Sequence, residues 1–474
     1  MKVRWWYGPL VLAAVTRLCH VNILWPEETL PLAAAVEMLN GRRLYRDIWF
    51  DKPPLAPAVC LLWGAQAGWP LRLAGALFVL LACWCVWGLA RALWGEREGR
   101  LAALLTAFFL SFWAPAAVMP LASDLLMLAP HAGAVWLAVK GRPLAAGLVA
   151  GLAFQSNPKG LLVLAASFLF APRAASQLAV GFLAPCVAVA AWLATQGALG
   201  DYWREVWCLG ATYARNTFLP QPWKVGLART VNWAGFHLAL VLGAAALWRR
   251  DRGGAGTKLA VWTLLGLAGV TLGLRFFPRY YFLLLPPLVV AAARGILLMS
   301  RRARVAVLAV LLIPLIRFGP RYLTLAADVV AGREHQWRDV AIDRDSRAAA
   351  GWLRTHAQPG ETLFVWGYRP ELYVYTRLPA ASRFLESQPL TGVFADRHLF
   401  QSDISDERLA CVSRRELLNA RPIWLVDGLT PLNPHLGMDR YPELRPWLAS
   451  YHLVAATRLA RIYRRTDLPR QAAR

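Results

Sequence analysis

Charged residues are scarce in this sequence. Only 17% of its 474 residues are Asp, Glu, Lys or Arg, whereas a soluble domain is usually about one quarter charged. With 57% hydrophobic residues and 23 tryptophans, this scarcity excludes an ordinary soluble protein. The composition indicates a protein built mainly from membrane helices.

Two further patterns are missing. The seven cysteines form no Cys-x-x-Cys pair, so the sequence shows neither a metal site nor a disulfide framework. No predicted helix carries a stripe of basic residues, although the formal net charge is +24. Because the arginines are scattered through loops and the tail, we attribute the charge to contacts with anionic membrane lipids and expect no nucleic acid partner.

Apolar stretches separated by short basic turns recur through the first two thirds of the chain. A helix satisfies its own backbone hydrogen bonds in lipid, so each stretch is a candidate span. We therefore expect residues 1–318 to form a polytopic α-helical membrane domain with about eleven spans, several of them shorter than the roughly 20 residues that a span needs. The stretches are 6–24, 71–91, 101–118, 124–139, 143–155, 160–171, 177–197, 231–248, 259–274, 280–298 and 304–318.

Basic residues predict how these helices are oriented. With the amino terminus inside, the short basic loops, such as those at Arg97 and Arg249, lie on the cytoplasmic side. The long polar insertion at 25–70 and the tail from residue 319 then lie on the outer face. We expect a multi-pass protein of the bacterial inner (plasma) membrane, with its active site and tail on the periplasmic or extracellular side.

The composition changes after Pro320, where charged residues become frequent and apolar runs shorten to strand length. We expect residues 319–474 to form a small soluble α/β domain. Asp343-Arg-Asp345 matches the Asp-x-Asp pattern that holds the metal of a nucleotide sugar, but it precedes a predicted helix, and acids favour helix starts. We interpret it as a helix start and expect no metal. Helices are predicted at 346–357 and near 406–419, and strands within 361–367, 372–375, 422–427 and 453–463.

The insertion holds acids and a lysine beside the bilayer, where charges are costly and need a reason. Pro26 suits the first position of a helix, Glu27 and Glu28 follow in its first turn, and Gly41 marks its end. We expect a short helix along the outer membrane surface. The two glutamates either complement its dipole or take part in chemistry.

Lys52 precedes two prolines, which deny it a regular helix and fix its direction. It either snorkels to phospholipid head groups or binds an anion. Together with Glu27-Glu28 and the stretch 41–47, this Lys-Pro-Pro motif resembles the polytopic GT-C glycosyltransferases, specifically the bacterial relatives of protein O-mannosyltransferases and of the lipid A aminoarabinose transferase. That family usually has Asp where this chain has Glu27, which leaves open whether Glu27 or Glu28 corresponds to its base.

Three later segments are similar to the same family. Asp124 lies where these enzymes carry a second acid, Lys159 ends a Gly-Leu-Ala…Lys segment, and Arg279 begins the entrance to a late helix. Singly, each has an ordinary explanation: Asp124 as a helix cap, the basic residues as snorkelling side chains, and Tyr280 as part of an aromatic belt. The predicted topology, however, puts all of them on the same outer face as the insertion.

Nucleotide sugars are cytoplasmic, so a donor that is reachable from the outer face is a sugar on a polyprenyl phosphate. Its leaving group is an anionic phosphate at the membrane surface, which fixed cations stabilise without a metal or cofactor. We expect Lys52, with Arg279 or Lys159, to supply those cations.

The acceptor hydroxyl must lose its proton as it attacks, and this requires a carboxylate base. Glu27 is the expected base, and Glu28 or Asp124 is expected to orient the acceptor. Asp51 and Tyr280 are expected substrate contacts. The resemblance implies that a single displacement inverts the anomeric configuration.

These observations predict a membrane glycosyltransferase that moves one sugar, of a kind the sequence does not specify, to a lipid, polysaccharide or protein acceptor. Two other classes stay open. A transporter or flippase of lipid-linked saccharides would need internal repeats and ionisable groups near the middle of the membrane, whereas most charges here lie at one surface. A glycan ligase or polymerase is closer in chemistry and would transfer a whole glycan.

Overall fold

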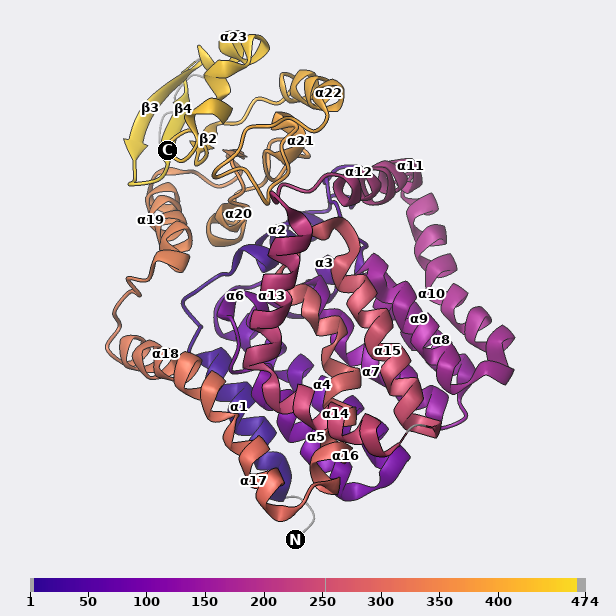
Figure 1. Ribbon diagram of the computed structural model, residues 1–474. Coiled ribbons are helices and arrows are strands. Elements are labelled where there is room, and N and C mark those ends of the chain that lie inside the picture. Colours follow the sequence, from indigo (N-terminus) through magenta and orange to yellow (C-terminus); the bar gives the residue numbers. More distant parts are fainter. Residues whose placement is uncertain (1–3, 252, 467–474) are drawn as a thin grey trace.

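The computed structural model describes residues 4–251 and 253–466. It consists of a large helical body and a smaller C-terminal tail region that carries a sheet, with the insertion between them (Figure 1). Each predicted apolar stretch contains at least one helix. The helices of the body and insertion are α1 (Tyr7–Leu18), α2 (Pro26–Leu39), α3 (Leu55–Cys60), α4 (Trp69–Trp94), α5 (Glu96–Phe109), α6 (Pro115–Val118), α7 (Ser123–Val139), α8 (Pro143–Ser156), α9 (Leu161–Phe170), α10 (Ala175–Thr195), α11 (Leu199–Tyr202), α12 (Leu209–Arg215), α13 (Pro222–Phe236), α14 (Leu238–Arg250), α15 (Gly254–Thr271), α16 (Leu285–Leu298), α17 (Arg301–Ala309) and α18 (Leu312–Val330).

Fewer helices than expected are long and apolar enough to cross a membrane by themselves. Within the described residues there are four, and a fifth if α13 and α14, which meet at 87°, form one broken span. Shorter apolar helices such as α1, whose 12 residues extend about 18 Å at 1.5 Å per residue, do not reach across the hydrocarbon core alone. The protein is membrane-embedded, but the expected eleven spans are not confirmed. The four are 69–94, 172–195, 254–274 and 301–330.

Small residues bring α8 and α10 into direct backbone contact. A Cβ atom on Gly147 would lie 2.1 Å from the Leu178 carbonyl oxygen, and one on Gly181 would lie 2.1 Å from the Leu144 carbonyl oxygen. Neither position tolerates a side chain. Close approach of this kind is how helices pack where lipid provides no hydrophobic drive between them.

The tail contains a four-stranded sheet in the order β1-β2-β4-β3, in which β1 and β2 are parallel and the other neighbours antiparallel. The small C-terminal sheet is therefore confirmed. The predicted strand at 372–375 is wrong, because this short apolar run forms a buried helix instead, and runs of that length fit either structure. The elements are α19 (Ala341–His356), β1 (Leu363–Trp366), α20 (Glu371–Thr376), α21 (Gln388–Thr391), α22 (Glu407–Leu417), β2 (Trp424–Asp427), α23 (Arg445–Leu448), β3 (Tyr451–Ala456) and β4 (Arg461–Arg465).

The helix predicted at 346–357 is present but starts earlier, because α19 begins at Ala341, five residues before the predicted start. Asp343 therefore lies in its first turn, as a helix start predicts, whereas Asp345 lies inside the helix, 2.8 Å from Arg369. The Asp-x-Asp pattern thus has an ion-pairing role at Asp345.

The insertion joins the helical body to the tail. Helix α2 begins at Pro26 and ends just before Gly41, whose φ of 86° suits glycine, so its predicted bounds are confirmed. The Ala380 amide donates to Glu37 Oε1 at 3.2 Å, and Arg42 donates to the Ser382 carbonyl at 2.9 Å. In Figure 1 the insertion helices lie at the end of the body that faces the tail.

Candidate active site

A cavity of about 540 Å³ lies between the helical body and the tail. The insertion, the start of α7, the turn between α8 and α9, and the segment before α16 form its lower walls. The tail covers it. Seven of the eight predicted site residues line this cavity, namely Glu27, Asp51, Lys52, Asp124, Lys159, Arg279 and Tyr280.

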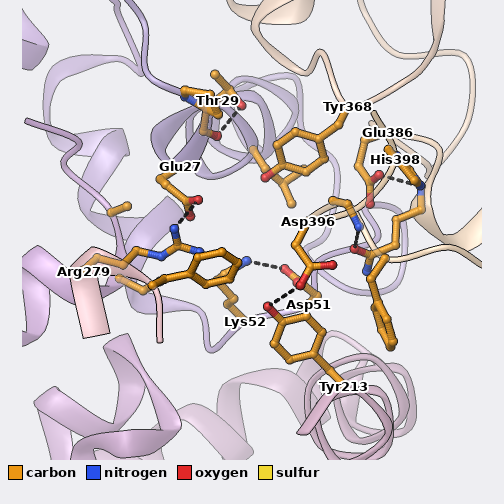
Figure 2. A pocket seen from close by; sticks show the side chains of 18 of the residues that line it. Glu27, Thr29, Asp51, Lys52, Tyr213, Arg279, Tyr368, Glu386, Asp396 and His398 are labelled. Atoms are coloured by element: carbon orange, nitrogen blue, oxygen red, sulfur yellow. Dashed lines mark hydrogen bonds and ion pairs between the residues drawn. The ribbon is translucent and has the colours of Figure 1, made fainter. Parts of the chain in front are cut away.

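Arg279 holds two of the carboxylates. Its Nη1 lies 2.7 Å from Glu27 Oε1 (Figure 2), and its Nε lies 3.2 Å from Asp124 Oδ2. Asn157 donates to the other oxygen of Asp124 at 3.0 Å. Burial alone would lower the pKa of Arg279, but the carboxylate of Glu27 and its other acidic neighbours raise it, so the guanidinium is a fixed cation between two acids.

Lys159 has no such partner. Its Nζ is buried without a hydrogen-bonding partner and lies 3.3 Å from the centre of the Tyr280 ring. The backbone around it is fixed, because Asn157 Oδ1 accepts a hydrogen bond from the Lys159 amide at 3.0 Å. A buried ammonium group that makes no hydrogen bond is costly, and an anionic ligand in the cavity could supply the missing acceptor.

The segment that carries Asp51 and Lys52 is held at several points. Lys52 Nζ lies 2.9 Å from Asp51 Oδ1. Tyr45, whose φ of 67° is unusual for a residue with a side chain, donates its hydroxyl to the Lys52 carbonyl at 2.7 Å. The Phe50 amide donates to Glu205 Oε2 at 3.0 Å. Burial alone would lower the pKa of Lys52, but its pairing with Asp51 raises it, so Lys52 is a cation.

Glu28 lies apart from the other predicted residues. It does not line the cavity, and its side chain is fully buried. Its carboxylate accepts hydrogen bonds from the amides of Trp25 at 3.0 Å and Leu121 at 2.9 Å, and both its oxygens contact Arg72. Adjacent residues in one helical turn thus face different surroundings, Glu27 toward the cavity and Glu28 toward the interior.

The tail supplies side chains that the sequence interpretation missed. Tyr368, Glu386, Asp396 and His398 line the cavity from above. Asp396 Oδ2 lies 2.7 Å from Arg275 Nε and accepts the Tyr213 hydroxyl at 3.2 Å (Figure 2). Burial raises the pKa of Glu386 well above its ordinary value. No local pattern in the sequence marks these residues, because only the fold brings them over the insertion.

The helical body resembles known glycosyltransferases in sequence and in structure. Residues 51–194 match the family model described as dolichyl-phosphate-mannose-protein mannosyltransferase. The crystal structure of ArnT from Cupriavidus metallidurans bound to undecaprenyl phosphate superposes with a TM-score of 0.62 at 16% identity, covering 97% of each chain. The chain has a GT-C fold. The apo state of the same ArnT gives a TM-score of 0.61 at 16% identity over 98% of each chain.

This result confirms the resemblance drawn from the motifs. The family model begins at Asp51 and includes Lys52, Asp124 and Lys159, whereas Glu27 and the whole tail lie outside it. An oligosaccharyltransferase from Archaeoglobus fulgidus shares 14% identity, with a TM-score of 0.47 over 89% of this chain and 68% of that chain. No curated protein matches this chain by sequence.

The described part of this chain contains no cluster of potential metal ligands. Across residues 4–251 and 253–466, no group of three or more His, Cys, Asp or Glu side chains is placed to hold an ion. The charged groups of the cavity are instead arranged as cations beside carboxylates. Such an arrangement can bind a phosphate and accept a proton at adjacent positions.

Proposed function

We propose that this protein transfers a single sugar from a polyprenyl phosphate carrier to an acceptor hydroxyl on the outer face of the membrane. The observation that carries the proposal is one cavity that holds three cations, Lys52, Lys159 and Arg279, next to the carboxylate of Glu27. The ArnT structure of the same fold is bound to undecaprenyl phosphate, which supports a donor of this class.

The cations would bind the donor phosphate. Lys159 Nζ has no protein partner and is buried, so a phosphate oxygen would satisfy it. Lys52 and Arg279 carry a second and a third positive charge on the same cavity wall. As the bond between the anomeric carbon and the phosphate oxygen breaks, the electron pair stays on the phosphate, and fixed cations stabilise the charge that develops.

The acceptor would be activated by Glu27. Its carboxylate takes the hydroxyl proton while the acceptor oxygen forms a bond to the anomeric carbon. Arg279 fixes the position of Glu27, and Asp124, held by Arg279 and Asn157, is placed to orient the acceptor. One displacement of this kind inverts the anomeric configuration. Glu28 is then a structural residue rather than an alternative base.

The test compares two substitutions in purified protein supplied with a panel of polyprenyl-phosphate monosaccharides and with lipid, polysaccharide or protein acceptors. Glu27→Gln keeps the shape of the side chain but cannot accept a proton, so turnover should fall by roughly two to four orders of magnitude. The control is Glu416→Gln on the exposed face of α22, which should leave turnover unchanged.

Two results would contradict the proposal. Near wild-type turnover in Glu27→Gln would remove Glu27 as the base. A wild-type protein that leaves every lipid-linked monosaccharide intact, but moves or joins lipid-linked glycans, would instead be a flippase or a ligase.

A further inference from the structure

In the part of the chain that the structure describes, the buried polar atoms of the cavity lining that have no hydrogen-bonding partner include Lys159 Nζ, Glu386 Oε1 and His398 Nδ1. Buried polar atoms in folded proteins are nearly always hydrogen-bonded, so each points to a ligand. Lys159 belongs to the helical body, where the donor phosphate is proposed to bind. The other two belong to the tail and have no role in that chemistry.

Glu386 is held so that one oxygen stays free. Its Oε2 accepts the Gln388 amide at 2.5 Å. The Gln388 side chain in turn accepts the Ala395 amide at 2.8 Å, which ties Glu386 to the segment that carries His398. The Glu386 residue is only 1% exposed. In Figure 2 it lies on the opposite side of the cavity from Glu27 and Arg279.

Tyr368 lies between these two sides. It follows β1 through Gly367, whose φ of 129° only glycine adopts readily, and this turn directs the ring into the cavity (Figure 2). Burial, with the nearby carboxylates of Glu27, Asp51 and Glu386, raises the pKa of Tyr368. The phenol therefore stays protonated and can donate a hydrogen bond.

The position of Tyr368, Glu386 and His398 in the cavity indicates which part of the substrate they contact. The acceptor hydroxyl must lie beside Glu27, and the phosphate beside Lys159. A sugar linked to that phosphate has to extend into the rest of the same cavity, which the tail encloses. A sugar ring offers hydroxyl groups that donate and accept, and an apolar face that packs on an aromatic ring.

We propose that Tyr368, Glu386 and His398 form the subsite that binds the transferred sugar, with Glu386 Oε1 accepting a hydrogen bond from a sugar hydroxyl or amino group. This inference rests on the proposed function, because it assumes a sugar linked to a lipid phosphate. The tail thereby selects the donor, while the helical body holds the phosphate and the base.

The experiment compares the affinities for two kinds of lipid. One is bare polyprenyl phosphate, and the other is a panel of the same lipid carrying single hexoses or pentoses, each measured by titration of detergent-solubilised protein. Wild type should bind at least one glycosylated lipid more tightly than the bare lipid. Glu386→Ala should lose that preference by about tenfold, since it removes the acceptor and leaves the sugar group without its buried partner, and it should keep the affinity for bare lipid.

Two controls separate the proposals. Lys159→Met should weaken binding of bare and glycosylated lipid alike, and Glu416→Gln should change neither. If Glu386→Ala does not fold, Tyr368→Phe provides the same comparison. In turnover, Glu386→Ala should raise the KM for donor more than it lowers kcat.

The outcomes are distinguishable. If wild type does not bind bare polyprenyl phosphate, the proposed function is wrong. If bare lipid binds but no sugar of the panel improves its affinity, or if Glu386→Ala keeps the full preference, the sugar subsite is wrong and the proposed phosphate site stands.

Discussion

Replacing Glu28 with glutamine tests whether two adjacent glutamates have different roles. The Glu28 and Arg72 side chains are 0% and 1% exposed, and the carboxylate also accepts the amides of Trp25 and Leu121. Glutamine keeps an oxygen but removes the charge, which leaves the Arg72 cation buried without its anion. Removing one partner of a buried ion pair costs about 3–5 kcal/mol.

That loss is large enough to measure in detergent solution. An unfolding entropy of about 2.1 cal/mol/K per residue amounts to roughly 1 kcal/mol/K for 474 residues, so Glu28→Gln should melt roughly 3–5 °C below wild type. Glu27→Gln, which lies in the cavity wall, should melt close to wild type. The double variant Glu28→Gln/Arg72→Met should recover most of the loss, because no charge is left buried alone.

One result would refute this reasoning. If Glu28→Gln melts like wild type but loses turnover while Glu27→Gln stays active, then Glu28 takes part in the chemistry, and the roles of the two residues are reversed.

Three further predictions concern pH, topology and the donor. Burial raises the pKa of Asp343 from 3.8 to about 7, against the hydrogen bond from Tyr375. An acid with a raised pKa resists ionisation in the folded state, so stability should fall as pH rises from about 4 to 7, and Asp343→Asn should flatten melting midpoints measured across that range. A reporter active only in the periplasm should work when fused after Val330 and fail after Asp251. Lys52→Met should weaken donor binding in the same lipid titrations. An unchanged donor affinity would mean that Lys52 pairs only with Asp51 or with lipid head groups.

The positions of the helices could be predicted because apolar composition is a local property. Each predicted stretch is helical, and the start of α2 at Pro26 follows from backbone rules alone. The number of spans could not be predicted in the same way. The stretch 231–248 looks continuous in sequence, yet the chain bends by 87° at His237, and tertiary packing rather than local composition sets that bend.

Part of the site was visible for a different reason. Glu27, Lys52, Asp124, Lys159 and Arg279 were grouped because the topology put them on one membrane face, and the structure brings them around one cavity. Which of two adjacent glutamates faces that cavity depends on a partner 44 residues away, which no motif encodes. The tail residues were missed because their neighbours in the insertion lie more than 300 positions earlier.

That separation has a consequence for how the protein is made. The insertion and the tail are joined by hydrogen bonds across 340 residues, such as that from Arg42 to the Ser382 carbonyl. At roughly 5–20 residues per second of synthesis, the tail residues that cover the cavity are made on the order of half a minute after the insertion. The cavity is therefore covered only after the tail has been synthesised. A chain that terminates before the tail carries the proposed base and cations but lacks the residues proposed to bind the sugar.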